Sequence, residues 1–187
     1  MCIVEIETER LILRTWQISD RAEFARLNSD FRVMEFMSAC LSPAESDLFL
    51  DRILEHFRNH GFGLWAVELR EERRFIGALG LMVPVFQAHF TPCVEIGWRL
   101  AADYWGRGLA TQGARAVAHH AFESLHLESL VSFTAPANLR SRRVMEKIGM
   151  TRDSSDDFEH PNLPEAHPLR PHVVYCLSRS NWPRARR

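Results

Sequence analysis

The segment of residues 93–135 constrains the fold more than any other part of the sequence. It reads as a strand over 93–100, a glycine-rich turn at 104–111, a helix over 112–125 and a second strand over 129–135. Two strands joined through a helix are expected to lie parallel in one sheet. The helix is indicated by six apolar residues that share one face, namely Ala114, Val117, Ala118, Ala121, Phe122 and Leu125.

The remaining patterns place this segment in an α/β fold built on a single mixed sheet. Further strands are expected at residues 9–16, 64–69, 75–83, 150–153 and 172–177. Further helices are expected after Asp20 and over residues 43–60 and 138–147. The order is then β-α-α-β-β-β-α-β-α-β-β, with antiparallel hairpins before the parallel pair. Because the chain has no repeat, low-complexity tract or interdomain linker, residues 1–187 are expected to form one domain.

Two helix starts carry capping signals. Ser42, Pro43 and Glu45 have the form of a capping box with proline in the first turn, which predicts a helix that begins at residue 43. Asp20 and Glu23 have the related acceptor-x-x-Glu form and predict a second capped helix. A long loop rich in proline, histidine and acidic residues is expected at 154–171, and its length indicates a functional or partner-binding role.

Composition excludes several classes of protein. The 23 Lys+Arg and 24 Asp+Glu residues give a net charge of -1, whereas binding to nucleic acid or to an anionic membrane needs a cationic excess. The terminal arginines at 184–187 are too few to change this expectation. No run approaches the ~18 apolar residues of a membrane span, and the N-terminus does not resemble a secretory signal. A cytoplasmic location is therefore expected.

Neither a disulfide framework nor a metal site is expected. The four cysteines, at positions 2, 40, 93 and 176, are widely spaced and form no C-x-x-C pair. His56 and His60 have the i, i+4 spacing that two metal ligands on a helix would need, but no third ligand follows in pattern, so surface histidines are the expectation.

The glycine-rich turn is the strongest candidate for an anion site. A strand that passes through such a turn into a helix brings free backbone N–H groups together at the positive end of the helix dipole. Gly106, Gly108 and Ala110 would allow close approach of a ligand, and Arg107 adds a positive charge. The spacing fits neither the P-loop nor the dinucleotide fingerprint, and a plain tight turn is the alternative.

A resemblance to a known family favours the anion site. Tyr104–Thr111, Asn138-Leu139-Arg140-Ser141 and Glu146–Met150 together resemble the acetyl-CoA-binding core of the GNAT N-acetyltransferase superfamily. Glu95–Trp98 and the opening Thr8–Arg14 are most similar to the branch of the ribosomal-protein N-terminal acetyltransferases RimJ and RimL. The resemblance covers nearly the whole chain, and the predicted element order is the one that this fold uses.

The resemblance implies which residues bind acetyl-CoA. Backbone amides of the turn would hold the diphosphate, with Trp105 replacing the family's Gln or Arg, while Asn138 would contact the pantetheine arm or act only as a helix cap. The side chains at 140, 142, 143 and 147 could meet the 3′-phosphate or form a solvated helix face. The implied acetyl-CoA-binding set is Trp98, Arg99, Trp105, Gly106, Arg107, Gly108, Leu109, Ala110, Thr111, Asn138, Ser141 and Lys147.

The resemblance also implies two catalytic residues. Glu95 is the one carboxylate in an apolar strand and would serve as a general base, directly or through water; alternatively it pairs with Arg99 or Arg10. Many relatives have a tyrosine acid at the position of Met145, which methionine cannot replace. Ser141 or water is then the candidate acid, and an ordinary first-turn hydroxyl is the alternative for Ser141.

The activity implied is transfer of the acetyl group of acetyl-CoA, by direct attack in a ternary complex, to a primary amine: a protein N-terminus or a small molecule. A non-catalytic acyl-CoA-binding regulator and an interaction module whose turn is structural are the alternatives. The acceptor is expected between the first two helices and the loop joining them, near Phe31, Phe36 and Met37, with Trp16 and the 154–171 loop as further walls. The chain is expected to be a monomer or a homodimer.

Overall fold

The computed structural model describes residues 3–182, so Cys2 and the terminal arginines lie outside the described residues. Within these described residues there are five α-helices: α1 (Asp20–Ser29), α2 (Phe31–Met34), α3 (Pro43–His60), α4 (Leu109–Glu123) and α5 (Leu139–Lys147). The strands are β1 (Ile6–Glu7), β2 (Leu11–Arg14), β3 (Leu64–Leu69), β4 (Arg74–Met82), β5 (Glu95–Leu100), β6 (Ser129–Thr134), β7 (Phe158–Glu159) and β8 (Pro171–Ser178).

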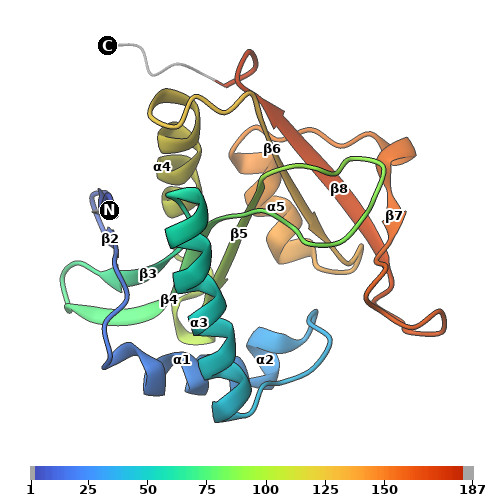
Figure 1. Ribbon diagram of the computed structural model, residues 1–187. Coiled ribbons are helices and arrows are strands. Elements are labelled where there is room, and N and C mark those ends of the chain that lie inside the picture. Colours follow the sequence, from blue (N-terminus) through green and yellow to red (C-terminus); the bar gives the residue numbers. More distant parts are fainter. Residues whose placement is uncertain (1–2, 183–187) are drawn as a thin grey trace.

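The eight strands form one mixed sheet in the order β1-β2-β3-β4-β5-β6-β8-β7. Strands β1 to β5 are antiparallel neighbours in chain order, β5 and β6 are parallel, and β6 pairs antiparallel with β8. The predicted parallel pair inside a sheet of antiparallel hairpins is therefore confirmed. Figure 1 shows β6 and β8 running side by side on one side of the molecule and the β3–β4 hairpin on the other.

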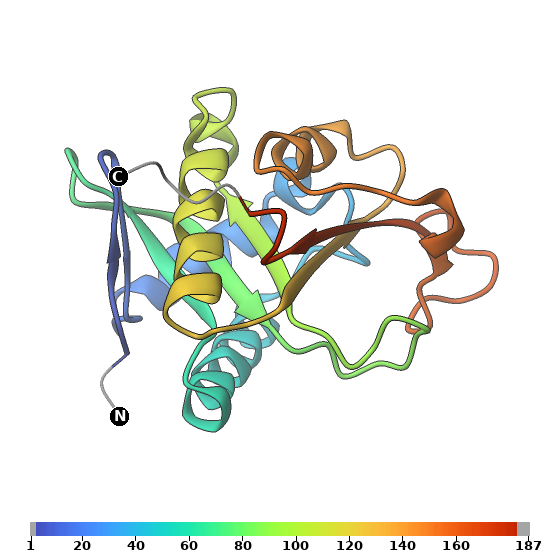
Figure 2. The same cartoon turned by 90° about the horizontal axis from the view of Figure 1, so that it is seen from above.

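Helices cover both faces of the sheet. Arg14 of β2 points to α1, where it bonds Asp20, whereas Leu11 and Leu79 point to α4. A Cβ placed on Gly113 of α4 would lie only 2.7 Å from Leu79 Cδ1, so only glycine allows this close approach of helix to sheet. Figure 2 shows α3 and α4 on opposite sides of the central strands. Of the helices in the described range, none is long and apolar enough to cross a membrane.

Helix α3 begins and ends as the sequence predicts. The Ser42 hydroxyl accepts a hydrogen bond from the Glu45 N–H, and the Glu45 carboxylate accepts one from the Ser42 N–H, which completes the capping box. Pro43 occupies the first turn, and Gly61 ends the helix in the left-handed conformation at φ 77°.

The predicted capping role of Asp20 is wrong. Helix α1 has Ser19 at its N-cap, with no side-chain capping bond. Asp20 is buried instead, where it accepts hydrogen bonds from the Arg14 guanidinium and from the Gln17 N–H. The local spacing to Glu23 fitted a cap, but a buried cation on the neighbouring strand binds the carboxylate more strongly than a backbone N–H does.

The structure also differs from the predicted strands at both edges of the sheet. The predicted strand at 150–153 is reduced to one bridge between Thr151 and Cys176, and the short β7 lies inside the segment predicted as loop. A two-residue strand, β1, precedes the predicted first strand. Edge strands of two residues leave too little periodicity to be recognised in a sequence.

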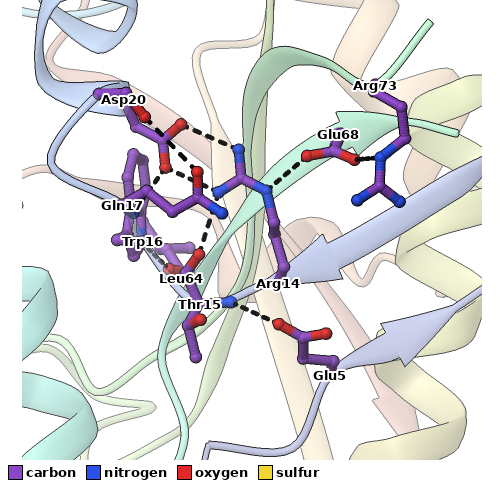
Figure 3. A network of polar contacts seen from close by, with 10 residues as sticks. Glu5, Arg14, Thr15, Trp16, Gln17, Asp20, Leu64, Glu68 and Arg73 are labelled. Atoms are coloured by element: carbon purple, nitrogen blue, oxygen red, sulfur yellow. Dashed lines mark hydrogen bonds and ion pairs between the residues drawn. The ribbon is translucent and has the colours of Figure 1, made fainter.

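A buried ionic network fixes α1 to the sheet (Figure 3). The Arg14 guanidinium bonds Asp20 at 2.7 and 2.9 Å and Glu68 at 2.7 Å, and Glu68 also pairs with Arg73 at 3.0 Å. These carboxylates, Asp20 first, raise the pKa of Arg14 above its ordinary value. The guanidinium is fully compensated, so its charge is retained inside the fold.

We expect Asp20→Asn to destabilise the protein by about 3 kcal/mol, because it leaves a buried guanidinium with one carboxylate partner instead of two. Urea denaturation measures the free energy of unfolding. Asp47→Asn is the matched control, because Asp47 pairs with Arg21 at the surface, where loss of an ion pair costs at most about 1 kcal/mol. Equal losses in the two variants would contradict the structural role of the buried network.

Candidate active site

The parallel strands β5 and β6 pair at only one position. Glu95 is opposite Val131, and the Val131 N–H donates to the Val94 carbonyl at 2.9 Å. Beyond this point β6 continues to pair with β8 over its whole length, as far as Thr134 opposite Val173. The strands therefore separate, and the edge of β5 from Gly97 to Leu100 has no partner strand on that side within the described chain.

Two adjoining hollows occupy the opening. The larger, of about 650 Å³, is called the main cavity; α3, β5, β6 and the residues after β4 line it. The smaller, of about 290 Å³, is called the side groove; the glycine-rich turn, the start of α4 and α5 line it. They adjoin each other, because five residues line both: Met37, Trp98, Arg99, Asn138 and Ser141.

The turn at the side groove requires glycine for its backbone conformation. Gly106 and Gly108 both have a φ of 75°, and a Cβ on Gly106 would meet no atom within 4 Å, so conformation and not space selects glycine there. Gly108 is the N-cap of α4, which begins at Leu109, three residues earlier than predicted. Leu109, Ala110 and Thr111 consequently belong to the first helical turn and line the groove.

The N-terminus of α4 offers unpaired donors to the groove. Gly108 has no side chain to cap the helix, and the first backbone bond of the helix joins the Gln112 N–H to the Gly108 carbonyl. The first-turn N–H groups are therefore free to bind an anion at the positive end of the helix dipole. This arrangement is the one that the sequence predicts.

Arg10, which the sequence does not single out for this role, holds the turn. Its Nη1 donates to the Arg107 carbonyl at 2.9 Å and its Nε donates to Gln112 at 3.1 Å. The guanidinium of Arg107 is exposed and lies 5.2 Å from the ring of Tyr104, so this side chain is not on the wall of the groove. Arg10 is 97 residues away from Arg107 in the sequence, which is why local patterns did not reveal this contact.

Trp105 and Arg140 form one wall of the groove. The Trp105 indole donates to the Leu100 carbonyl at 2.8 Å, and the Arg140 guanidinium lies 4.5 Å from the indole ring. Arg140 also pairs with Glu35 next to α2, so it connects α5 with the α2 region across the groove. Of the predicted basic cluster, Arg142 bonds Tyr175 instead, whereas Arg143 and Lys147 line the groove.

Asn138 and Ser141 lie where the two hollows meet. Asn138 caps α5, because its Oδ1 accepts from the Ser141 N–H at 3.2 Å and its Nδ2 donates to Thr134 at 2.9 Å. The predicted capping role is confirmed. One turn further on, Met145 is buried and forms part of the main cavity.

Glu95 lies at the point where β5 and β6 separate and has an unusual carboxyl group. Burial raises the pKa of Glu95 to about 8. Its Oε1 is 3.7 Å from the position of a Cβ on Gly97, so the carboxyl extends along the cavity face of β5. Within residues 3–182, no ion pair to Glu95 is formed: Arg10 holds the turn, and Arg99 bonds Asn28.

The walls of the main cavity differ in part from expectation. Met37 lines it as predicted, and His160 does so from the 154–171 segment. Phe36 lines the side groove, and Phe31 is 76 % exposed and lines neither hollow. Trp16 lines neither hollow and donates to the Leu64 carbonyl. Further lining side chains, not expected from the sequence, are four residues of α3 and two phenylalanines outside it: Phe49, Arg52, Glu55, Asn59, Phe86 and Phe133.

His56 is buried, so the expectation of a surface histidine is wrong for this residue. Its Nδ1 lies 2.8 Å from the Phe62 carbonyl, and its Nε2 accepts from the Val83 N–H at 3.0 Å. Because Nε2 accepts, the neutral ring carries its proton on Nδ1, and burial lowers the pKa of His56. In the described range no group of three or more His, Cys, Asp or Glu side chains could hold a metal.

Comparison with known proteins identifies the family. A family model described as an acetyltransferase (GNAT) domain matches residues 10–151. The chain is 27% identical over 184 residues to the uncharacterized N-acetyltransferase YnaD of Bacillus subtilis, a match that covers 96% of this chain and 99% of YnaD.

Two solved structures have the same fold. An acetyltransferase from Agrobacterium tumefaciens is 29% identical, with a TM-score of 0.77 and a match covering 95% of each chain. RimJ of Mycobacterium smegmatis, solved in complex with CoA-disulfide, has a TM-score of 0.78 at 17% identity and is matched over 97% of this chain and 90% of its own. The match to the family model spans most of the sequence and includes the five residues that line both hollows. The chain therefore belongs to the GNAT acetyltransferase family.

Proposed function

We propose that this protein transfers the acetyl group of acetyl-CoA to a primary amine by direct attack within a ternary complex. The observation that carries the proposal is that the two hollows adjoin each other where β5 and β6 separate. At one end lie the unpaired N–H groups of α4, which suit a diphosphate, and at the other lies a carboxyl group with a raised pKa.

The side groove is proposed to bind the coenzyme. Main-chain N–H groups of residues 106–111 would bind the diphosphate, and Arg143 and Lys147 would add positive charge from α5. The unpaired edge of β5 at Trp98 and Arg99 offers backbone groups to the amides of the pantetheine arm, as an added strand would use them. Asn138 and Ser141 lie beside this path.

Glu95 is proposed to act as the general base. An ammonium group cannot attack a thioester, so the acceptor must lose a proton to a group on the wall of the main cavity, directly or through one water. A carboxylate whose pKa is about 8 holds a proton far more strongly than an ordinary glutamate and is therefore a better base near neutral pH. A backbone N–H near Trp98–Arg99 would polarise the carbonyl of the bound thioester.

The described cysteines do not favour an acetyl-enzyme route. Burial, followed by Glu95 and Cys176, raises the pKa of the Cys93 thiol to about 11, so little thiolate forms there. Cys40, Cys93 and Cys176 line neither hollow. Ser141 or a water is proposed to protonate the departing thiolate, because the thioether of Met145 has no proton to give.

The second candidate is a regulator that binds acyl-CoA without turnover. Met145 favours it, because this residue stands where the resemblance places an acidic tyrosine. Both functions would use the side groove to bind the coenzyme. They differ in whether the carboxyl of Glu95 acts as a general base.

We expect Ala110→Asp to weaken acetyl-CoA binding at least tenfold while the fold is kept. The new carboxylate, in the first turn of α4, would cap the free N–H groups and repel the diphosphate. Calorimetric titration with acetyl-CoA measures the affinity. Leu139→Asp introduces the same charge in the first turn of α5, outside both hollows, and should bind as the parent does. Unchanged affinity in the Ala110 variant would place the diphosphate elsewhere.

We expect Glu95→Gln to lower kcat by roughly 10²- to 10⁴-fold and leave the affinity for acetyl-CoA unchanged, since it removes only the base. Release of free thiol from acetyl-CoA in the presence of an amine panel measures turnover, and calorimetry measures affinity. Glu123→Gln, at the exposed end of α4, is the control. If the parent itself shows no turnover with any amine yet binds acetyl-CoA, the regulator is the correct function.

The pH dependence should report the same carboxyl group. Because the pKa of Glu95 is raised to about 8, the base is mostly protonated below that pH and ionised above it. The ratio of kcat/KM for the parent to that for Glu95→Gln should therefore rise with pH, pass its midpoint near pH 8 and level off about one pH unit higher. Taking the ratio on one acceptor cancels the ionisation of the acceptor amine. A ratio that is constant from pH 6 to 9 would rule out Glu95 as the base.

A further inference from the structure

The main cavity contains a guanidinium that has no acidic partner in the described part of the chain. Arg99 lies on β5 and, by strand alternation, on the same face as Glu95 and Gly97. Its Nη1 donates to Asn28 Oδ1 at 2.5 Å, and its Nη2 lies 3.5 Å from the sulfur of Met37. Both partners are neutral, and among residues 3–182 no carboxylate lies within ion-pair distance of Arg99.

The contact with Asn28 is fixed from behind. Asn28 is fully buried, and its Nδ2 donates to Ser46 Oγ at 2.8 Å, so its oxygen must face Arg99. The Arg99 guanidinium also lies 5.4 Å from the ring of Phe49. Arg99 is therefore held in place by neutral groups, with its remaining N–H groups available to the hollows that it lines.

The charge of Arg99 is costly where it lies. Burial lowers the pKa of Arg99 to about 10, whereas the carboxylates around Arg14 raise the pKa of that arginine. A guanidinium at pKa 10 is still protonated at neutral pH. An uncompensated charge in a partly buried site is stabilised when an anion joins it, and a carboxylate can accept two parallel N–H bonds from the guanidinium.

A second cation increases the positive potential at this wall. The Arg52 guanidinium of α3 lies 5.6 Å from the ring of Phe49, and Arg52 also lines the main cavity. Glu95 does not offset these charges at neutral pH, because its pKa of about 8 keeps it mostly protonated. Glu55 is the other carboxylate on the wall of the main cavity.

Aromatic side chains form another part of the wall of the main cavity. Phe86 packs against Phe133 at 5.6 Å and against His160 at 4.8 Å between ring centroids, and Phe24 and Phe49 lie on the α1–α3 side. The volume of about 650 Å³ is in the usual range of a pocket for a small molecule.

We propose that the acceptor is a small amine that also carries a carboxylate and an apolar body, that is, an amino acid or a closely related compound, with its carboxylate on Arg99. The inference rests on the proposed function and names the substrate class of the same site. A monoanion is favoured over a phosphate, because Arg99 is a cation held inside the wall by hydrogen bonds whereas Arg52, the second arginine on the wall in the described part of the chain, is exposed. One arginine suits a carboxylate, whereas a dianion needs more compensation.

The test compares acids with their amides as acceptors. The panel contains L-phenylalanine, L-methionine and longer amino acids in which the amine and the carboxylate are further apart, each with its carboxamide. We expect the parent to favour the acids by ten- to a hundredfold in kcat/KM, as expected for a hydrogen-bonded charge pair in a partly desolvated site. Binding of the N-acetylated acid and its amide, measured by calorimetry with CoA present, should show the same preference.

Asn28→Asp is the most selective variant. It places a carboxylate against Arg99 without changing the size of the side chain, and its second oxygen can accept from the Ser46 hydroxyl. The variant should lose the preference for acids while the KM for acetyl-CoA stays constant. Arg99→Gln should lose it too, and Arg99→Lys should restore part of it. Arg26→Gln, which removes an exposed charge from the same helix as Asn28, should keep the full preference.

The outcomes separate this inference from the proposed function. Transfer to amines with no preference for acids, or a preference that Asn28→Asp leaves intact, would overturn the inference and leave the proposed function standing. A preference for peptides over free amino acids would assign the cavity to a protein N-terminus and also overturn it. A change in the KM for acetyl-CoA in the Asn28 variant would place the coenzyme, not the acceptor, on Arg99. Absence of transfer to any amine would remove the proposed function itself.

Discussion

The separation of β5 from β6 is the constraint on which the rest of this structure depends. After one paired position at Glu95 and Val131, β6 follows β8, and the backbone of β5 is left with an open edge. An unpaired edge inside a sheet is unfavourable unless other groups use its donors and acceptors. Every other part of the candidate site is arranged around this edge: the α4 N-terminus at one end, the cap of α5 beside it, and Glu95 at its origin.

The buried Arg14 and the partly buried Glu95 and Arg99 have opposite electrostatic surroundings. Arg14 pairs with two carboxylates, Asp20 and Glu68, and so holds α1 against the sheet. Glu95 and Arg99, on the wall of the main cavity, have no charged partner among the described residues, and burial moves the pKa of each toward neutrality. Ionisable side chains that have no charged partner and a shifted pKa are typical of binding sites, whereas paired charges such as Arg14 are typical of structural contacts.

Much of the site could be predicted from sequence because its signals are local. The strand, turn and helix over 93–125 carry their own periodicity, and Asn138 caps its helix from within four residues. The failures share one cause, which is dependence on distant contacts. Asp20 has the spacing of a helix cap but hydrogen-bonds Arg14. His56 was expected at the surface but is buried, with its ring nitrogens at the Phe62 carbonyl and the Val83 N–H. Asn28, the asparagine behind Arg99, is on helix α1, 71 residues away.

Arg10 connects the segment before β2 to the turn at which the diphosphate is proposed to bind. Arg10 hydrogen-bonds the Arg107 carbonyl, 97 residues away, and the Gln112 side chain, 102 residues away. Both contacts lie at the turn where the diphosphate is proposed to bind. Thermodynamic linkage then requires that a ligand which needs the ordered turn also stabilises the pairing of β2. A tag, fusion or proteolytic cut near residue 10 would consequently change the behaviour of a loop that it never touches.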